Sequence, residues 1–193
     1  MTRGLVLCAA LFTALLVAAA PAAAAKRRLL VNGDSLAVGT QPYIGAALPG
    51  WRVLHSVAIS RHAYEGPGVL RAYGRRLPAV IHVSLGTNDD PRQASGFLSA
   101  IHAVMDAVGR RRCVVWANIV RPPVAGASYR GYNRVLGHEA RRRRNLRVVD
   151  WARLVREHPG WLAGDGVHVS AEGYRERARV VARAVTRCRR SLG

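Results

Sequence analysis

Five apolar runs of strand length, separated by stretches with a helical pattern, constrain the fold of this chain more than any other feature. The runs are residues 29–32, 53–59, 79–85, 113–119 and 146–150. They are rich in β-branched residues and nearly continuous rather than alternating, as expected of strands buried on both faces. Strands that alternate with helices predict right-handed crossovers and a parallel sheet covered on both sides. The sequence therefore predicts one α/β domain, a three-layer α/β/α sandwich with about five parallel strands.

The helical pattern is clearest in the last of the stretches between and after these runs. There, Tyr174, Ala178, Val181 and Val185 recur three or four residues apart, which is the spacing of one helix face. We expect the arginines of this segment on the opposite, solvated side. The predicted helices are residues 36–48, 66–76, 93–109, 128–143 and 171–188.

The first 25 residues have the pattern of a secretory signal peptide. An uncharged stretch from residue 4 to 25 follows Arg3, and Ala23 and Ala25 fit an A-x-A cleavage site. An uncleaved membrane anchor is the alternative, because 22 uncharged residues are long enough to cross a bilayer core of about 30 Å. Pro21, just before the alanine tract, favours the signal peptide. Cleavage after Ala25 would leave a domain of residues 26–193, secreted or associated with the cell envelope.

Export changes the interpretation of two cysteines. Cys113 begins a predicted strand and Cys188 ends the last predicted helix, so both could lie at the same edge of the sheet. In an oxidising compartment they could form one disulfide, whereas in the cytosol buried thiols are expected. Two cysteines so far apart, without clustered histidines, make a poor zinc site.

Polar residues follow the predicted strands where each one ends. Ser35 comes after the first strand, Ser60 after the second, Asn88 after the third, and Asp165 with His168 after the last. Because the carboxyl ends of parallel strands meet at one edge of an open sheet, we expect these side chains to converge. The fourth strand is followed by residues 121–128, a loop that could wall the site or contact substrate.

These residue types suit acyl transfer. Ser35 would stand at a strand-to-helix turn as the nucleophile, and His168 is the natural base to take its proton. Asp165 is three residues earlier, a spacing that lets its carboxylate orient and stabilise the imidazolium. An oxyanion hole could come from the backbone N–H groups of Ser35 and Ser60 and the side-chain amide of Asn88. This chemistry requires no metal and no organic cofactor.

Three blocks of the sequence resemble, in their order and spacing, those of the SGNH or GDSL hydrolases. The blocks are Gly33-Asp34-Ser35-Leu36, Gly86-Thr87-Asn88-Asp89 and Asp165-Gly166-Val167-His168. The resemblance covers residues 29 to about 185 and implies a flavodoxin-like sandwich with serine esterase, lipase or acetyl esterase activity. It implies Ser35 as nucleophile, Asn88 as oxyanion donor, His168 as base and Asp165 as its partner.

The sequence departs from the family pattern in the second block. That block usually supplies a glycine N–H, and the corresponding Ile59-Ser60-Arg61 contains no glycine. Donation by the Ser60 N–H is in doubt if the site needs a backbone conformation that only glycine adopts readily. The stretch from Val148 to Asp165 also resembles, more loosely, the SGNH portions of envelope acyltransferases.

Charge says less about the reaction than the motifs do. The 193 residues include 30 Lys+Arg and 11 Asp+Glu, a net charge of +19, with Lys26 the single lysine. Such an arginine bias could reflect coding bias. We expect no specific nucleic-acid partner, because charge alone sets non-specific association. The net positive charge could, however, hold an exported enzyme against an anionic cell envelope.

The leading hypothesis is an exported serine esterase or deacylase, a monomer that acts on a small-molecule or glycan ester. An acyltransferase on envelope polysaccharide is one alternative, and a non-enzymatic binder of an anionic polymer is another. A metal-dependent phosphoesterase built on Asp34, Asp89, Asp90 and Asp165 is the third. We favour a turn and an N-cap before the helix at residue 93 as the role of Asp89 and Asp90.

Overall fold

All five predicted strands are present and pair in parallel in the computed structural model, which describes residues 27–192. Their order in the sheet is β2-β1-β3-β4-β5, the doubly wound order of flavodoxin-like folds. The predicted signal peptide, residues 1–25, lies outside the described residues. The strands are β1 (Arg27–Gly33), β2 (Trp51–Val57), β3 (Val80–Ser84), β4 (Cys113–Ala117) and β5 (Leu146–Val149).

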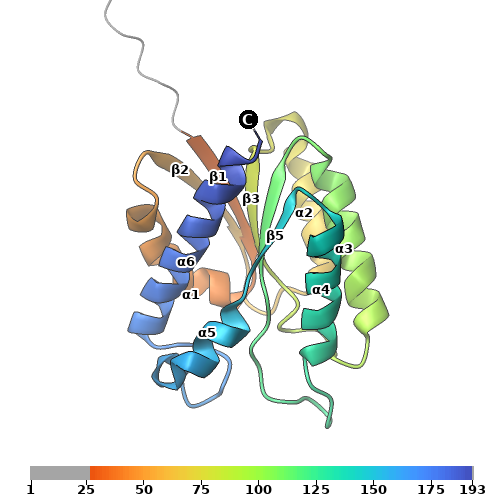
Figure 1. Cartoon of the computed structure of the whole chain (residues 1–193), viewed down its shortest axis with the longest axis vertical. Coiled ribbons are helices and arrows are strands. Elements are labelled where there is room, and N and C mark those ends of the chain that lie inside the picture. The colour runs from red at the N-terminus through yellow and green to blue at the C-terminus, as the bar shows by residue number, and fades with distance from the viewer. Residues whose placement is uncertain (1–26, 193) are drawn as a thin grey trace, which may run out of the picture.

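Two layers of helices cover the sheet and confirm the predicted α/β/α sandwich (Figure 1). Alternate strand residues supply the two cores: Leu29 packs with one helix layer and Leu30 with the other. No helix of residues 27–192 is both long and apolar enough to cross a membrane. One layer consists of α1 (Ser35–Ala47), α5 (Trp151–Glu157) and α6 (Ala171–Arg190), and the other of α2 (Gly66–Tyr73), α3 (Ala94–Val108) and α4 (Arg130–Arg142).

The second strand, the second helix and a missed helix are the main differences from the sequence prediction, and the other elements differ at their ends by one or two residues. The second strand covers residues 51–57 rather than 53–59, and as an edge strand it is half-buried, not buried on both faces. Helix α2 ends at Tyr73 instead of residue 76, because Gly74 has a φ of +50° and a 3-10 turn follows it. Helix α5 was not predicted. It begins directly after β5, capped by the Asp150 side chain, which accepts the Arg153 N–H.

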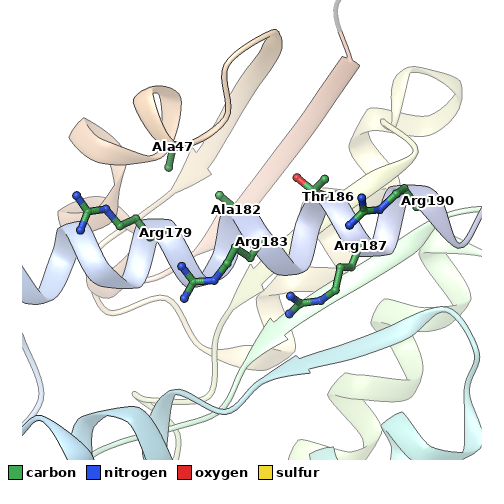
Figure 2. Close-up of a pocket in the computed structure, with 7 residues that line it drawn as sticks. All are labelled: Ala47, Arg179, Ala182, Arg183, Thr186, Arg187 and Arg190. Atoms are coloured by element: carbon green, nitrogen blue, oxygen red, sulfur yellow. The ribbon is translucent and has the colours of Figure 1, made fainter.

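Helix α6 does not keep all its arginines on the solvated side. Arg177 is 1% exposed and lies on the face that packs against the sheet, so the expectation of a purely outward arginine face is wrong. Its position is three residues after Tyr174 and four before Val181, which is the spacing of the buried face. The outward face carries Arg179, Arg183, Arg187 and Arg190 (Figure 2).

A disulfide joins Cys113 to Cys188, with a Cα–Cα distance of 5.9 Å. Cys113 is the first residue of β4, and Cys188 lies in the last turn of α6. The bridge therefore fixes the end of α6 at the amino edge of the sheet, the edge opposite Ser35.

Candidate active site

The turn between β1 and α1 places Ser35 at the carboxyl edge of the sheet. Asp34 caps the helix, and its Oδ1 accepts the Leu36 N–H at 3.0 Å. Gly33 permits this tight turn, because a Cβ there would collide with the Cβ of Ala37. As the first helical residue, Ser35 has a backbone N–H with no hydrogen-bond partner among residues 27–192. A hydroxyl and a free N–H donor thus face the same space.

The Ser35 hydroxyl, His168 and Asp165 form one hydrogen-bonded chain. His168 Nε2 lies 2.9 Å from Ser35 Oγ, and His168 Nδ1 lies 2.6 Å from Asp165 Oδ2. The other carboxylate oxygen of Asp165 accepts the backbone N–H groups of Val167 and His168, each at 2.9 Å. The hydrogen bond from His168, followed by these N–H groups, lowers the pKa of Asp165 to about 2. The carboxylate beside the imidazole is therefore ionised at neutral pH.

Backbone hydrogen bonds and a glycine fix the conformation of the loop that carries Asp165 and His168. The Ala163 N–H donates to the His168 carbonyl at 2.8 Å, and the Ser170 N–H donates to the Trp161 carbonyl at 2.8 Å. Gly166 has a φ of +67°, and a Cβ at this position would press on Pro122. Glycine is needed here both for the left-handed backbone and for the close approach.

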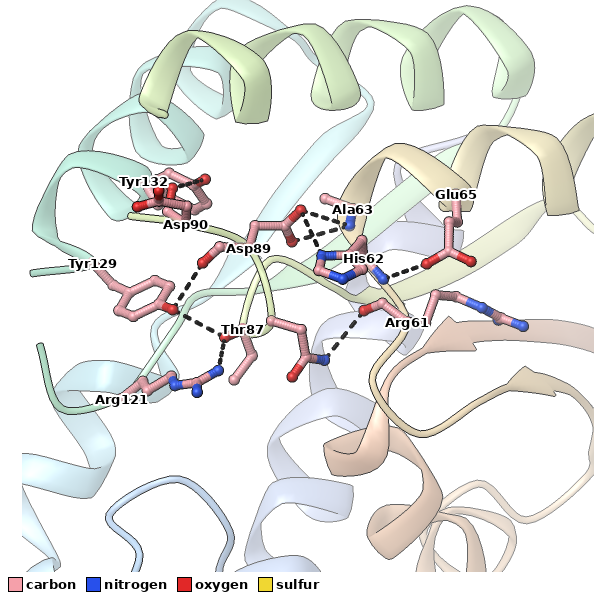
Figure 3. A network of polar contacts seen from close by, with 11 residues as sticks. Arg61, His62, Ala63, Glu65, Thr87, Asp89, Asp90, Arg121, Tyr129 and Tyr132 are labelled. Carbon is pink, nitrogen blue, oxygen red and sulfur yellow. Dashed lines mark hydrogen bonds and ion pairs between the residues drawn. The ribbon is translucent and has the colours of Figure 1, made fainter. Parts of the chain in front are cut away.

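Asn88 lies beside Ser35 in a loop that is held from two sides. One N–H of its amide donates to the Arg61 carbonyl at 3.2 Å, which leaves the second for the cavity. Its neighbour Thr87 presents a carbonyl to Arg121 at 2.5 Å and to the Tyr129 hydroxyl at 3.1 Å. The same hydroxyl lies 2.9 Å from the Asp89 carbonyl. Figure 3 shows Arg121 and Tyr129 converging on this loop.

Asp89 and Asp90 each have a local partner. The Asp89 carboxylate accepts the Ala63 N–H at 3.0 Å and lies 3.4 Å from His62 Nδ1 (Figure 3). Burial raises the pKa of Asp89, and the Ala63 hydrogen bond partly offsets this shift. Asp90 accepts the backbone N–H of Arg92, as in the predicted turn. The predicted cap is wrong, because Gln93 precedes α3 and no side chain caps that helix.

The metal-site alternative lacks its ligand cluster. Asp34 is buried directly before Ser35, whereas Asp89 bonds the Ala63 backbone and Asp165 bonds His168. Among residues 27–192, no group of three or more histidines, cysteines or carboxylates is placed to share a metal ion.

A cavity of about 370 Å³ opens beside Ser35. The loop after β4 forms one wall, as the sequence indicated. Arg121 places a cation in this wall. Its guanidinium donates to the carbonyl of Thr87, the residue before Asn88. The cavity is lined by Ser35, Asn88, Arg121, Pro122, Pro123, Val124, Asp165, Val167 and His168.

Ser60 does not line this cavity. It has a φ of 61°, in the left-handed region where glycine is favoured and where a serine is strained. The backbone at this position thus has the glycine-type conformation that the resemblance implies. Its role as an oxyanion donor stays a prediction.

The sequence analysis missed a buried chain of polar groups that begins at Asp34, next to Ser35. Ser84 Oγ donates to Asp34 Oδ1 at 3.3 Å, and Arg177 Nη2 donates to Ser84 Oγ at 3.0 Å. The Arg177 guanidinium carbon also lies 5.0 Å from the centre of the Trp151 ring. Burial raises the pKa of Asp34 and lowers that of Arg177 to about 10. Burial thus disfavours the charged forms of both Asp34 and Arg177, and the attraction between their opposite charges opposes this effect.

No family model and no curated protein matches the sequence, but solved structures match its fold. The catalytic domain of the peptidoglycan O-acetyltransferase OatA of Streptococcus pneumoniae has a TM-score of 0.67 at 17% identity, over 87% of this chain and 94% of that one. A lipolytic G-D-S-L family member from Veillonella parvula has a TM-score of 0.70 at 14% identity, over 83% and 99%. A family 3 carbohydrate esterase from Clostridium thermocellum has a TM-score of 0.63 at 16% identity, over 86% and 99%. The resemblance noted in the sequence is confirmed at the level of architecture, and this chain has the fold of the SGNH, or GDSL, hydrolases.

Proposed function

We propose that the protein is a serine esterase or deacylase that forms an acyl-enzyme at Ser35. The observation that carries this proposal is the chain from Ser35 Oγ to His168 Nε2 at 2.9 Å and from His168 Nδ1 to Asp165 at 2.6 Å, open to a cavity. A serine hydroxyl becomes a nucleophile only when a base takes its proton, and this geometry provides that base.

The reaction begins when Ser35 Oγ attacks the acyl carbon of an ester and its proton passes to His168 Nε2. Asp165 stabilises the resulting imidazolium through Nδ1. The N–H of Ser35 and the free amide N–H of Asn88 stabilise the oxyanion. His168 then returns the proton to the leaving alcohol. In the second half, a water attacks the acyl-enzyme and gives its proton to His168. His168 then returns this proton to Ser35 Oγ as the bond to the acyl group breaks and the carboxylic acid leaves.

The cavity favours a short acyl group. Its volume of about 370 Å³ lies near the lower end of the range of about 300–1,000 Å³ typical of small-molecule sites. Acetyl and other short esters carried by envelope glycans or lipids are therefore the proposed substrates.

Acyl transfer to a hydroxyl acceptor is the second candidate function, because the same acyl-enzyme can react with an alcohol instead of water. The solved domain from S. pneumoniae is described as an O-acetyltransferase. Product analysis of an aryl acetate reaction, with and without a soluble oligosaccharide, separates the two: acetylated sugar marks the transferase, and acetate alone marks the esterase.

We also propose that the protein is exported, because the pattern of residues 1–25 accompanies a disulfide between Cys113 and Cys188. Cleavage after Ala25 removes Cys8 and leaves both remaining cysteines in the bridge. Mass spectrometry of protein from the native host should find Lys26 at the amino terminus and no free thiol. A chain that begins at Met1 with three alkylatable thiols would contradict export.

Labelling with a fluorophosphonate probe tests the nucleophile. Ser35 should be the labelled residue in the wild-type protein, and Ser35→Ala should abolish labelling. Ser99→Ala is the matched control, because Ser99 is exposed on α3 and its hydroxyl bonds only the Ser95 carbonyl. Labelling that survives Ser35→Ala would refute the proposed nucleophile. Labelling that is unaffected by His168→Ala would refute the proposed base.

A further inference from the structure

Exposed arginines collect at the edge of the sheet opposite Ser35. Each strand has at least one exposed arginine within its first two residues or in the four residues before it, and these include Arg28, Arg52, Arg76, Arg111 and Arg144. Arg28 and Arg52 are paired in register on adjacent strands. Because the amino ends of parallel strands meet at one edge, these cations share one end of the molecule.

Several acidic residues lie at the other end, whereas Asp106 and Glu139 lie in the second halves of α3 and α4. Asp34 and Asp150 directly follow β1 and β5, and Asp89 and Asp165 belong to the loops around Ser35. Arg61 and Arg121 also lie near Asn88, so the two signs of charge are only partly separated. The arginines at the amino edge are therefore considered on their own.

The outward face of α6 extends this basic end into a groove. Arg179, Arg183, Arg187 and Arg190 line a cavity of about 420 Å³ together with Ala47, Ala182 and Thr186 (Figure 2). Arg179 is paired with Glu176, but within residues 27–192 no carboxylate pairs with Arg183, Arg187 or Arg190. The disulfide at Cys188 fixes the last turn of the helix at the amino edge, so the groove and the strand-start arginines adjoin.

The spacing of these arginines fits a linear anion. From Arg183 to Arg190, positions three or four residues apart place a cation about every 5 Å along the helix, over a total of about 10 Å. Guanidinium groups bind phosphate oxygens in a bidentate manner. We propose that the α6 groove, defined as Arg183, Arg187 and Arg190, binds a linear polymer that carries a phosphate in each repeat.

Two other polyanionic surfaces fit this groove less well. Proteins that lie on membranes insert apolar side chains beside their cations, but the large exposed apolar residues of the described chain, Ile59 and Tyr64, lie in the loops on the Ser35 side. Proteins that bind single-stranded nucleic acid stack its bases on aromatic side chains. The cavity that contains the α6 groove is lined by arginine, alanine and threonine side chains, so it offers no aromatic ring for stacking.

This site would tether the enzyme without occupying its catalytic cavity. Helix α6 has 20 residues, or about 30 Å of length, and begins just after His168. The α6 groove arginines lie in its second half. A bound polymer would leave Ser35 free to act on a neighbouring chain or on another component of the same surface.

The test measures binding of fluorescent inorganic polyphosphate to the disulfide-bonded protein over a range of salt concentrations. The variant Arg183→Gln/Arg187→Gln/Arg190→Gln should bind about tenfold more weakly or worse at low salt, and the slope of log K against log salt should fall by about 2. The control variant Arg71→Gln/Arg130→Gln/Arg156→Gln removes the same charge from other exposed positions and should bind within about threefold of wild type.

Each other result would overturn the proposal. Equal losses in the two variants would show that net charge alone drives binding. Tighter binding to duplex DNA at the same phosphate concentration would identify a nucleic-acid surface. Binding to phosphatidylglycerol vesicles but not to polyphosphate would identify a membrane surface. Protein labelled at Ser35 by fluorophosphonate should bind as well as unlabelled protein, so this result is independent of the esterase proposal.

Discussion

Replacing His168 with alanine is expected to lower kcat for a short aryl ester by about 10⁴- to 10⁶-fold, the range seen when a serine hydrolase loses its base. His168 Nε2 lies 2.9 Å from Ser35 Oγ, and Asp165 bonds His168 Nδ1 instead of that hydroxyl. Without it, the proton of Ser35 has no acceptor during attack. The residual rate would come from the Ser35 N–H and the Asn88 amide.

Asp165→Asn should cost less, about 10²- to 10⁴-fold. The amide can donate to Nδ1 and so favour the wrong tautomer, but the Asp165 side chain is 50% exposed, and water screens part of its charge. The double variant with His168→Ala should be no slower than His168→Ala alone, because Asp165 acts through the imidazole. Since the pKa of Asp165 is about 2, its protonation should contribute no loss of activity at any pH well above that value.

Steady-state kinetics, with circular dichroism to check folding, measure these effects. His138→Ala is the control, because His138 is exposed on α4 and distant in sequence from every site residue. A folded His168→Ala protein that retains more than a tenth of wild-type kcat would refute the assignment of the base. Additive losses in the double variant would refute the idea that Asp165 acts through His168.

The strands were predictable because their burial on both faces leaves a continuous apolar signal. Helix α5 was missed although its signals exist: Asp150 is a capping residue, and Trp151, Leu154 and Val155 have helical spacing. At seven residues, and directly joined to β5, it offers too short a window for periodicity to separate it from the strand.

The convergence of Ser35 and Asn88 was predictable because both follow strands whose carboxyl ends meet at one edge of the sheet. The expectation that His168 follows the last strand was wrong, because α5 and a 3-10 turn separate it from β5. The groups that hold these residues in place were not predictable. Tyr129 fixes the Asn88 loop through backbone carbonyls, and a contact with main chain leaves no trace in the partner's sequence. Arg177 carried a signal in its spacing, but an arginine in a helix rich in arginines is expected in solvent.

Arg177→Met is expected to reduce the free energy of unfolding by about 3 kcal/mol at neutral pH. The substitution removes the cation that offsets the buried Asp34 carboxylate. The coupling passes through Ser84, since Arg177 Nη2 donates to Ser84 Oγ and that hydroxyl donates to Asp34. This indirect arrangement places the expected cost at the lower end of the range for a broken buried ion pair.

The deficit should depend on pH in a defined direction. In the variant, the pKa of Asp34 in the folded state rises further above that of the unfolded chain. The folded protein then binds more protons than the unfolded chain in the interval between the two pKa values, so it loses stability as pH increases through that interval. Urea unfolding of both proteins should therefore give a small difference at acidic pH and the full difference at neutral pH.

The double variant Asp34→Asn/Arg177→Met separates charge from packing. Asparagine can still accept the Leu36 N–H as an N-cap, and neither site then holds a charge. If an uncompensated carboxylate causes the loss, the double variant should regain at least half of it at neutral pH. A deficit of the same size in the single and double variants, or one that does not change with pH, would mean that Arg177 stabilises the fold through its packing against Trp151. The stability of the strand-to-helix turn that carries Ser35 would then not depend on the buried charge of Arg177.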